Sequence, residues 1–488
     1  MLFIGVDLGS TNIKAALYDG AFRRLHMESA AVTYMRGNGS VEFDADAYVH
    51  VLTGILHRLI KASAADARSI CSITFTGQAE SLVVLDSNGN PLMNAISWMD
   101  ERSQEECALV EKQFSPAVCY AHTGQPAVLP TWPATKILWL RRHRPELDSV
   151  AAHYVLLKDF VVYRLTGNLL ADRSIATFTF YFDIYAKRYW PEMLEFIGIQ
   201  ETQLPSLAEP CTCAGTLKKD VAAAIGLSEG ATVNIGTLDH FAGMVGTGNV
   251  HVGCMNLSTG TVMGLSSIAA LPVRQDTGIP MHYGFLPNSY VMLPVAESGG
   301  VSLEWFKQIC MAATSYEELN AALVGRAPSE IIFLPYIVGT NAPEFDRDAC
   351  GVFFGLRSKH DGFDLALAVM EGVAHLLKKN CDHISASGTP IERIIATGGG
   401  AKSPIWCQMQ ADITGIPVYI PLEKEAACLG AAMIGAVAAN VYASYDEAAA
   451  GVVRMEQCFL PSPSEQFQRK HHQFLALYDA MMKVQQIR

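Results

Sequence analysis

The sequence LFIGVDLGSTNIKAALY, from Leu2 to Tyr18, contains two short apolar runs separated by glycine and hydroxyl residues. Apolar runs of this length are typical of buried strands, and the intervening DLGSTN is rich in turn formers. The stretch therefore predicts a strand, a tight turn and a second strand. In such a turn, backbone N–H groups and hydroxyls can converge on an anion, and Lys14 adds a positive charge close by.

Asp7 lies at the end of the first predicted strand. A buried carboxylate is costly there unless it is paired or lies near a metal ion. In one interpretation the hairpin grips phosphate groups and Asp7 faces a nucleotide-bound metal. In the other the hairpin is an ordinary one and Asp7 is a turn residue.

The composition narrows the class of protein. The chain has 488 residues, 50% of them hydrophobic, and a formal net charge of −12. This size predicts two or three domains, and the absence of lysine- or arginine-rich runs predicts neither nucleic acid nor an anionic membrane as partner. No apolar stretch reaches transmembrane length and no signal peptide is visible. The 12 cysteines are scattered without a CxxC pair, so we expect reduced thiols in a cytoplasmic protein.

Strand-like and helix-like segments alternate along the chain. Ile70–Gly77 and Leu82–Leu85 predict strands, and the pattern over 43–65 has helical spacing. This alternation indicates an α/β fold. Further helices are predicted at Pro133–His143, Val155–Gly167 and Ala426–Ala439.

Polar side chains follow the predicted strand ends. They are Gln78, Glu80, Trp98 and Asp100. Open α/β folds commonly bind ligands at such positions, so these groups could bind a sugar, or they could lie in solvated loops. The ring of Trp98 could offer an apolar face to a sugar or pack in the core.

Asp239 marks a second informative stretch. The run Thr232–Leu238 predicts a strand, and Asp239 then opens a small-residue segment that extends to Gly248. An aspartate at a strand-to-helix junction can be a helix N-cap, or it can be a general base that projects into a cleft.

The strand–turn–strand pattern of the opening hairpin recurs in the second half, over Leu257–Gly264. Two such hairpins, one in each half, could grip a triphosphate from both sides. Ile394–Ser403 is a strand that enters three consecutive glycines, which allow a flat or anionic ligand to approach the backbone closely.

As a set, these motifs resemble the FGGY carbohydrate kinases, within the actin/hexokinase/heat-shock-chaperone ATPase superfamily. Residues 7–14 resemble the first phosphate motif of the family, 257–264 the second, and 397–403 the adenosine motif. Residues 133–143 resemble one family signature, with a mismatch at Thr131, and 351–371 fit the other. The motifs occur in family order over nearly the whole chain.

The resemblance implies two ribonuclease-H-like (actin-like ATPase) domains that flank a catalytic cleft. The boundaries that it implies are 1–246 for an N-terminal domain, 247–440 for a C-terminal domain, and 441–488 for a helical extension.

The implied activity is phosphorylation of a sugar hydroxyl with ATP and Mg²⁺. Asp239 matches the catalytic aspartate of the family, which accepts the proton of the attacking hydroxyl, and Asp7 would face Mg²⁺. Phosphate contacts are implied for Gly9, Ser10, Thr11, Lys14, Gly260 and Thr261. The nucleotide pocket is implied to include Gly300, Glu304, Gly399, Gly400 and Ser403.

Departures from the family pattern concern the sugar. Relatives that act on xylulose often have GQMHG where residues 77–81 are GQAES. Glu80 resembles the substrate-binding glutamate of glycerol kinases, but Ala79 replaces the arginine beside it. His240 stands where many relatives have an amide. The candidate sugar contacts are Gln78, Glu80, Trp98, Asp100, Asp239 and His240.

Several functions remain open at this point. The leading hypothesis is a kinase of a ketose, xylulose- or ribulose-like, and the alternatives are a polyol, a deoxy-ketose, a seven-carbon ketose or a signalling sugar. A different class, a nucleotide-binding sensor or chaperone-type ATPase of the same fold, needs no acceptor base, and the presence of Asp239, Gln78 and Trp98 argues against it. The expected partner is a small sugar or polyol. The oligomeric state stays open, with a homodimer as one alternative.

Overall fold

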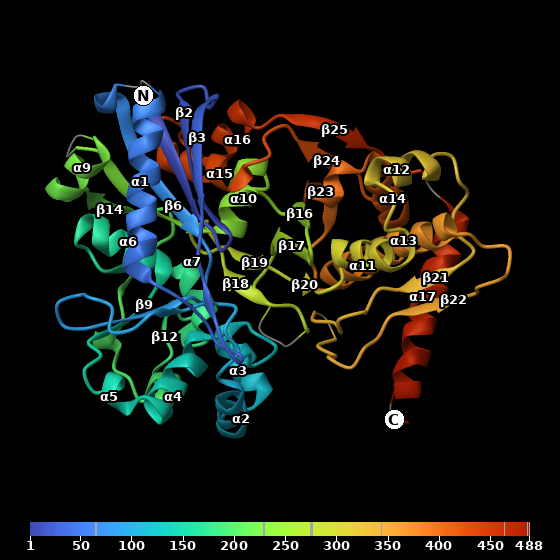
Figure 1. Cartoon of the computed structure of the whole chain (residues 1–488), viewed down its shortest axis with the longest axis horizontal. Coiled ribbons are helices and arrows are strands. Elements are labelled where there is room, and N and C mark those ends of the chain that lie inside the picture. Colours follow the sequence, from blue (N-terminus) through green and yellow to red (C-terminus); the bar gives the residue numbers. More distant parts are fainter. Residues whose placement is uncertain are drawn as a thin grey trace.

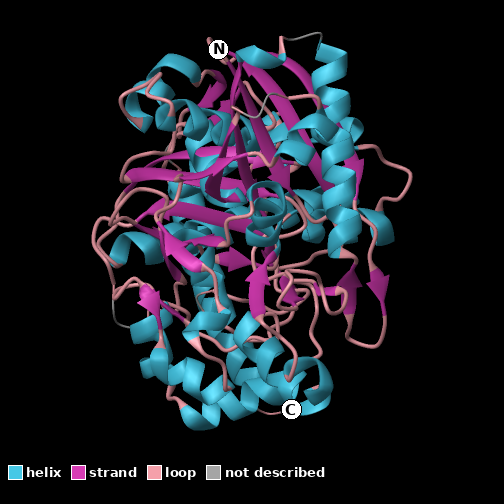
Figure 2. Ribbon diagram, turned by 90° about the vertical axis from the view of Figure 1, so that its left-hand side faces the viewer, coloured by secondary structure: helices cyan, strands magenta, loops and turns pink. Residues whose placement is uncertain are grey.

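A computed structural model describes residues 1–488 except 64–65, 228–229, 274–276, 343, 463, 486 and 488. Two lobes lie side by side, with the N-terminal lobe on the left and the C-terminal lobe on the right in Figure 1. Each lobe is a sheet flanked by helices, and in the rotated view of Figure 2 strands run through the interior with helices around them. This arrangement confirms the predicted α/β class and the two-domain, actin-like ATPase architecture.

The N-terminal sheet has six strands. The opening hairpin is confirmed, because β1 and β2 are antiparallel neighbours. On the other side of β1, β6 runs parallel to it, and β15 runs parallel to β6. The strands in spatial order are β14 (Cys213–Thr216), β15 (Thr232–Leu238), β6 (Ile70–Gly77), β1 (Leu2–Leu8), β2 (Asn12–Asp19) and β3 (Arg24–Ala31).

The C-terminal sheet repeats this order. Here β16 and β17 form the second hairpin, and β16, β23 and β24 are parallel. The two hairpins predicted from the sequence therefore occupy equivalent positions in two related sheets. The strands are β18 (Met281–Tyr283), β19 (Tyr290–Met292), β17 (Met263–Ile268), β16 (Gly253–Thr259), β23 (Ile391–Gly398), β24 (Val418–Pro421) and β25 (Met455–Phe459), with β20 (Val295–Ala296) paired to β17.

The side chains of β1 alternate between two faces of the N-terminal sheet, as they must in a strand. Ile4, Val6 and Leu8 enter a core with α1 (Ala45–Ser63). On the opposite face lies α15 (Ala426–Ala438), which packs so closely that a Cβ atom at Gly5 would lie 1.9 Å from the carbonyl oxygen of Cys428. Asp7 follows Gly5 by two residues and therefore shares the α15 face.

The helices α10 (Asp239–Thr247) and α15 cross between the two lobes (Figure 1). The two helices can approach each other closely because glycine lies at the crossing on each of them. A Cβ atom at Gly430 would lie 1.8 Å from the Ala242 carbonyl oxygen, and one at Gly246 would lie 2.0 Å from the Ala426 carbonyl oxygen. The small-residue helix predicted over 426–439 is thus confirmed, and its composition has a packing reason.

A smaller sheet in the N-terminal lobe carries the predicted sugar loops. Its strands are β4 (Met35–Arg36), β5 (Val41–Phe43), β8 (Ala95–Ile96), β7 (Leu82–Leu85) and β9 (His153–Leu156), in that order. The helices in the same part of the lobe include α2 (Gln104–Gln113), α3 (Pro116–Thr123) and α4 (Pro133–His143) (Figure 1), and α8 (Pro191–Ile197) packs against α4. The predicted helix at 133–143 is confirmed with its bounds.

Two predicted segments differ from the structure. The helix predicted over Val155–Gly167 begins only at Leu157, as α6 (Leu157–Thr166), because the preceding residues complete β9. The stretch 441–488, predicted as a helical extension, contains α16 (Tyr445–Val452) and α17 (Glu465–Gln485) but also β25, which pairs with β24. This stretch therefore contributes the edge strand β25 to the C-terminal sheet.

The remaining helices of the C-terminal lobe are α11 (Gly300–Cys310), α12 (Tyr316–Leu323), α13 (Gly362–Ala386) and α14 (Pro404–Thr414). None of the helices in the described part of the chain combines the length and the apolar character needed to cross a membrane.

The α10–α15 crossing generates a stability prediction. We expect Gly430→Ala to lower the free energy of unfolding by at least about 2 kcal/mol, because the new methyl group meets a backbone carbonyl that cannot move independently. Gly243→Ala is the matched control on α10, since a Cβ atom there meets nothing within 4 Å. It should be neutral or stabilise by roughly 0.5–1 kcal/mol. Urea unfolding measures both, and equal stability of the two variants would contradict the packing argument.

Candidate active site

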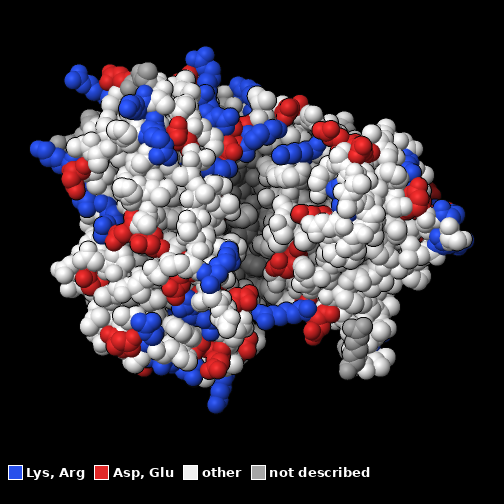
Figure 3. Space-filling view, viewed as in Figure 1, with Lys and Arg blue, Asp and Glu red and all other residues white. Residues whose placement is uncertain are grey.

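A hollow separates the two lobes on the face shown in Figure 3. A cleft of about 270 Å³ draws its lining from both sheets and from the two crossing helices. The residues that line it include Asp7, Asp239, His240, Asn256, Ser258, Thr397, Gly398, Lys424 and Glu425. The structure therefore brings together Asp7 and Asp239, which lie 232 positions apart in the sequence.

Asp7 is a buried carboxylate without a protein partner for one of its oxygens. Its Oδ1 atom accepts no hydrogen bond from the described residues. The pKa of Asp7 is raised to about 7, mainly by burial and in part by the nearby Asp239 carboxylate, against the opposing charge of Lys14. An unpartnered, buried carboxylate oxygen in a cleft is suited to a hard cation such as Mg²⁺.

Asp239 is the first residue of α10, directly after β15. A bulge bends β15 at Gly236, whose φ of 58° and close approach to the Phe75 oxygen leave no room for a side chain. The Oδ1 atom of Asp239 accepts a hydrogen bond from the His240 backbone N–H at 2.6 Å. Burial raises the pKa of Asp239, and His240 opposes the shift.

The first predicted phosphate hairpin is held by residues of the predicted sugar loops. Gln78 Nε2 donates to the Gly9 carbonyl at 3.4 Å, and Gln78 Oε1 accepts from Ser81 at 2.7 Å. The indole N–H of Trp98 donates to the Ser10 hydroxyl at 2.7 Å. Trp98 itself is exposed rather than part of a core. Gln78 and Trp98 thus connect the predicted sugar site with the predicted phosphate site.

Lys14, predicted as a phosphate contact, has a partner in this structure. Its Nζ atom lies 2.6 Å from the Glu425 carboxylate, in the loop that precedes α15. Lys14 is also the register partner of Asp7 across the β1–β2 hairpin. Its charge therefore lies between two carboxylates at the edge of the cleft, and the pairing with Glu425 was not foreseen from the sequence.

A larger cavity, of about 500 Å³, lies in the C-terminal lobe. Gly260, Thr261, Gly300, Glu304, Gly399, Gly400 and Ser403, all predicted as nucleotide contacts, line it together. The side chains of Tyr316, Asn320 and Trp406 complete its walls. Asn320 accepts a hydrogen bond from the Ser403 hydroxyl at 2.7 Å. A volume of this size with apolar and polar walls suits a nucleoside.

Glu80 belongs to a buried polar cluster. Its backbone is left-handed, with a φ of 65°, and Lys136 Nζ donates to its carbonyl oxygen at 2.9 Å. Burial raises the pKa of the Glu80 carboxyl, whereas Lys136 and a hydrogen bond from Thr131 lower it. Burial also lowers the pKa of Lys136. Glu80 and Thr131, two of the departures noted in the sequence, are thus neighbours in space.

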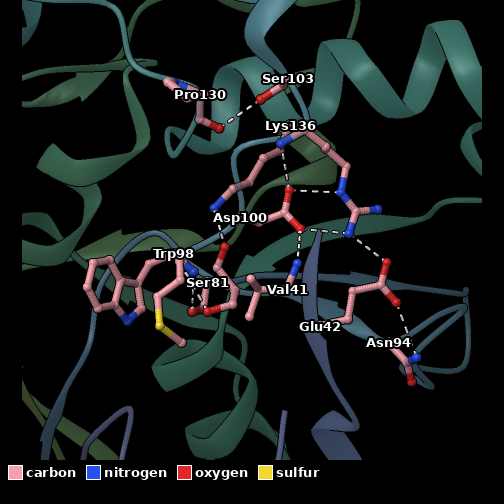
Figure 4. Close-up of polar contacts among 12 residues, drawn as sticks. Val41, Glu42, Ser81, Asn94, Trp98, Asp100, Ser103, Pro130 and Lys136 are labelled. Atoms are coloured by element: carbon pink, nitrogen blue, oxygen red, sulfur yellow. Dashed lines mark hydrogen bonds and ion pairs between the residues drawn. The ribbon is translucent and has the colours of Figure 1, made fainter. Parts of the chain in front are cut away.

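Asp100 is placed differently from the prediction. It is fully buried, and its oxygens accept hydrogen bonds from the Val41 N–H at 2.6 Å and from the Arg102 side chain at 2.7 and 2.8 Å (Figure 4). The Arg102 guanidinium also forms an ion pair with the Glu42 carboxylate at 2.7 Å, and it lies over the Trp139 ring. The carboxylate of Asp100 therefore orients Arg102 and β5 and does not face the cleft.

Tyr48 was missed by the sequence analysis. Its hydroxyl donates to the Gly9 carbonyl at 3.1 Å, from the buried face of α1. Tyr48 lies on the apolar face of its helix, where the sequence alone does not distinguish a tyrosine that makes a polar contact from one that packs in the core. Asn320 was missed for a related reason, because α12 begins with an ordinary Ser315–Glu318 capping box.

Two ribonuclease-H-like lobes, a predicted phosphate hairpin in each, and a nucleoside-sized cavity beside a carboxylate cleft are the arrangement expected of a nucleotide-dependent phosphotransferase. Comparison with known families specifies the class further. The model described as "FGGY family of carbohydrate kinases, N-terminal domain" matches residues 2–246, and its C-terminal counterpart matches residues 255–439. The chain belongs to the FGGY family and is an ATP-dependent sugar kinase.

Individual relatives cover nearly the whole chain. The xylulose kinase of Bacillus subtilis is 29% identical over 462 residues, which are 94% of this chain and 92% of the relative. The gluconokinase of the same organism is 26% identical and covers 91% of this chain and 88% of its own length. A crystal structure described as a "xyloylose kinase" from Brucella ovis superposes with a TM-score of 0.92 at 28% identity, over 99% of this chain and all of that one.

The pKa of Asp7 generates a prediction on stability. Because its pKa is about 7 in the folded protein and near 3.8 in the unfolded chain, the stability that this group contributes is present below pH 3.8 and is lost as the pH rises through 7. Without Mg²⁺, Asp7→Asn should therefore be more stable than the wild type at pH 8, by up to roughly 4 kcal/mol, and the difference should shrink toward pH 4.5.

Denaturant unfolding at several pH values measures this difference. Asp479→Asn, an exposed carboxylate on α17, serves as the control and should show no such trend. A wild type that is more stable than Asp7→Asn at pH 8 without metal would contradict the assignment.

Proposed function

We propose that this chain transfers the γ-phosphate of ATP to a hydroxyl of a ketose, a pentulose of the xylulose or ribulose type, with Asp239 as general base. The observation that carries the proposal is the placement of the Asp239 carboxylate in the cleft between the two phosphate hairpins, beside Asp7. A base in that position can accept the proton of a hydroxyl that attacks a phosphate held by both lobes.

The raised pKa of Asp239 supports this role. A carboxylate with an ordinary pKa is a weak base at neutral pH, and burial brings its proton affinity closer to that of the group it must deprotonate. The His240 N–H holds one of the carboxylate oxygens, which orients the other for the substrate.

Asp7 is proposed to hold Mg²⁺, directly or through water, with its unpartnered oxygen. When bound, the ion neutralises phosphate charge during transfer. Gly9, Ser10 and Thr11 in one hairpin and Gly260 and Thr261 in the other are proposed to donate hydrogen bonds to the phosphates. The nucleoside is proposed to occupy the cavity between Gly300, Gly399 and Ser403.

Lys14 is proposed to contact phosphate by leaving Glu425, or to share its charge between the two. Approach of the lobes around the α10–α15 crossing would exclude water from the cleft, which limits hydrolysis of ATP.

A neutral ketose is favoured over an aldonic acid such as gluconate. Two carboxylates, Asp7 and Asp239, already line the cleft, and Glu80 lies in the predicted sugar site. A substrate carboxylate would add a like charge in a partly buried site, where repulsion is poorly screened. Hydroxyl groups, in contrast, can donate to Glu80 and accept from Gln78 or the Trp98 loop.

The direct test is sugar-dependent release of ADP from Mg-ATP over a panel of ketoses, alditols, aldoses and gluconate. We expect a pentulose to give the highest kcat/KM. A response confined to a polyol or to gluconate would overturn the pentulose assignment, and the absence of any response with intact ATP binding would favour the sensor alternative.

Replacement of the base gives a sharper prediction. We expect Asp239→Asn to lower kcat by between about a hundredfold and ten-thousandfold, because the attacking hydroxyl keeps its proton, with ADP affinity within about twofold of the wild type. Calorimetric ADP binding and coupled-assay turnover measure the two quantities. Normal turnover in this variant would falsify the role of Asp239.

The Glu80 cluster gives a prediction on substrate binding. At pH 8, above the raised pKa of about 7 of Glu80, we expect Glu80→Gln to raise KM for the sugar by about tenfold or more and to leave KM for ATP unchanged, because a charged hydrogen-bond acceptor is replaced by a neutral one. Glu101→Gln is the matched control, since Glu101 is exposed in the neighbouring loop. Equal sugar KM values for the two variants would remove Glu80 from the sugar site.

A further inference from the structure

A cavity of about 410 Å³ lies where the two lobes meet, separate from the cleft and from the nucleoside cavity. We call it the junction pocket. Its lining comes from the β2–β3 turn, from both crossing helices, from the β24–α15 loop and from the connection between α16 and β25: Ala21–Arg24, Gly246, Pro421–Lys424, Leu429 and Gly451–Arg454. Cavities of this volume commonly hold small molecules.

The lining is basic although the chain as a whole carries a net charge of −12. Its cations are Arg23, Arg24, Lys424 and Arg454, and its single carboxylate is Glu423. Figure 3 shows Lys and Arg gathered along the upper edge of the molecule, where β2, β3 and α16 lie in Figure 1. A local reversal of the overall charge favours an anionic ligand.

The existing partners of these cations leave one positive charge uncompensated. Arg23 pairs with Asp19, Arg24 pairs with Glu423 at 2.8 Å, and Lys424 pairs with Glu456 at 2.5 Å. No ion pair among the described residues includes Arg454, whose guanidinium donates only to the carbonyls of Ala450, Gly451 and Val453. Arginine binds phosphate and carboxylate groups with two parallel hydrogen bonds, so Arg454 is the strongest candidate for an anion contact.

The rest of the lining is apolar. The side chains of Phe22, Pro421, Leu422, Leu429, Val452 and Val453 contribute to it. A bare inorganic ion would leave this surface uncovered, whereas an anion attached to an apolar body would cover it.

The pocket is also linked to the catalytic cleft. Lys424 lines both cavities, and the next residue, Glu425, pairs with Lys14 opposite Asp7. Lys424 and Glu425 belong to the same loop. An anion that draws Lys424 away from Glu456 therefore acts on the loop whose Glu425 pairs with Lys14.

We infer that the junction pocket is a binding site for a small molecule that carries a phosphate or carboxylate group on an apolar body. The site recognises the anion with Arg454, Arg24 and Lys424 and covers the apolar body with the side chains around Phe22 and Leu422. This inference goes beyond sugar phosphorylation and does not depend on which sugar is used.

Isothermal titration calorimetry on the full chain tests the inference. The probes are phenyl phosphate, benzoate and the uncharged benzyl alcohol, each titrated in the presence of saturating ADP and Mg²⁺ so that the catalytic cleft is occupied. We expect one molecule of an anionic probe to bind per chain, with phenyl phosphate and benzoate together showing which oxyanion is preferred. Benzyl alcohol should bind at least about tenfold more weakly, because it lacks the charge-assisted hydrogen bonds.

Variants locate the binding. Arg454→Gln should weaken binding of the preferred probe by about tenfold or more, and Arg454→Lys should retain part of the affinity. The control is Lys61→Gln, which removes one exposed positive charge from α1 and should have no effect on binding. Arg24→Gln provides a second test in case the loss of Arg454, which also caps α16, prevents folding.

Three results would overturn the inference: no binding of either anion at millimolar concentration, equal binding of benzyl alcohol, or equal affinity in the wild type and the folded pocket variants. Because heat of binding is measured rather than turnover, none of these results depends on the proposed kinase reaction.

Discussion

The backbone contact between α10 and α15 is the constraint on which the rest of the structure depends. The two helices approach so closely that glycine is required on each, at Gly246 and Gly430. The same α15 lies against Gly5 of β1. Asp239 at the start of α10, Glu425 before α15 and Asp7 on β1 are thereby fixed relative to one another. A site assembled from three distant segments needs such rigid crossings, because a displacement of about 1 Å is costly for in-line transfer.

The charges in the cleft follow from this geometry. Asp7, Asp239 and Glu425 bring three carboxylates to a partly buried region, and Lys14 is the cation that pairs with Glu425 there. Burial raises the pKa of both Asp7 and Asp239, and the Asp239 charge adds to the shift of Asp7, so a cation in the cleft would favour the ionised form of these carboxylates. An excess of carboxylates in a partly buried cleft is suited to a cation, and the chain belongs to a family of carbohydrate kinases.

The parts that could be predicted from the sequence are those with local signals. The two hairpins, the strand before Asp239, the helix after Pro133 and the glycine-rich turn at 398–400 all have the expected structure, because apolar periodicity and turn residues specify them. The seven residues of the C-terminal half that were predicted as nucleotide contacts line one cavity. What could not be predicted depends on distant partners. The pairing of Lys14 with Glu425, the burial of Asp100 against Arg102 and the addition of β25 to the sheet have no signature in their own segments.

The Glu80 cluster shows why a substrate cannot be assigned from one motif residue. In the sequence, Glu80 resembles a glycerol-kinase glutamate whose arginine neighbour is missing. In the structure, Lys136 of α4 donates a hydrogen bond to the backbone carbonyl of Glu80, and the Thr131 hydroxyl forms a hydrogen bond with the Glu80 carboxyl group. Burial raises the pKa of that carboxyl, so at neutral pH it can donate as well as accept a hydrogen bond. Such a group can bind sugar hydroxyls in more than one orientation. The environment of Glu80 is therefore set by the cluster as a whole, and Thr131, a mismatch in a signature of the family, is as much a part of that cluster as Glu80.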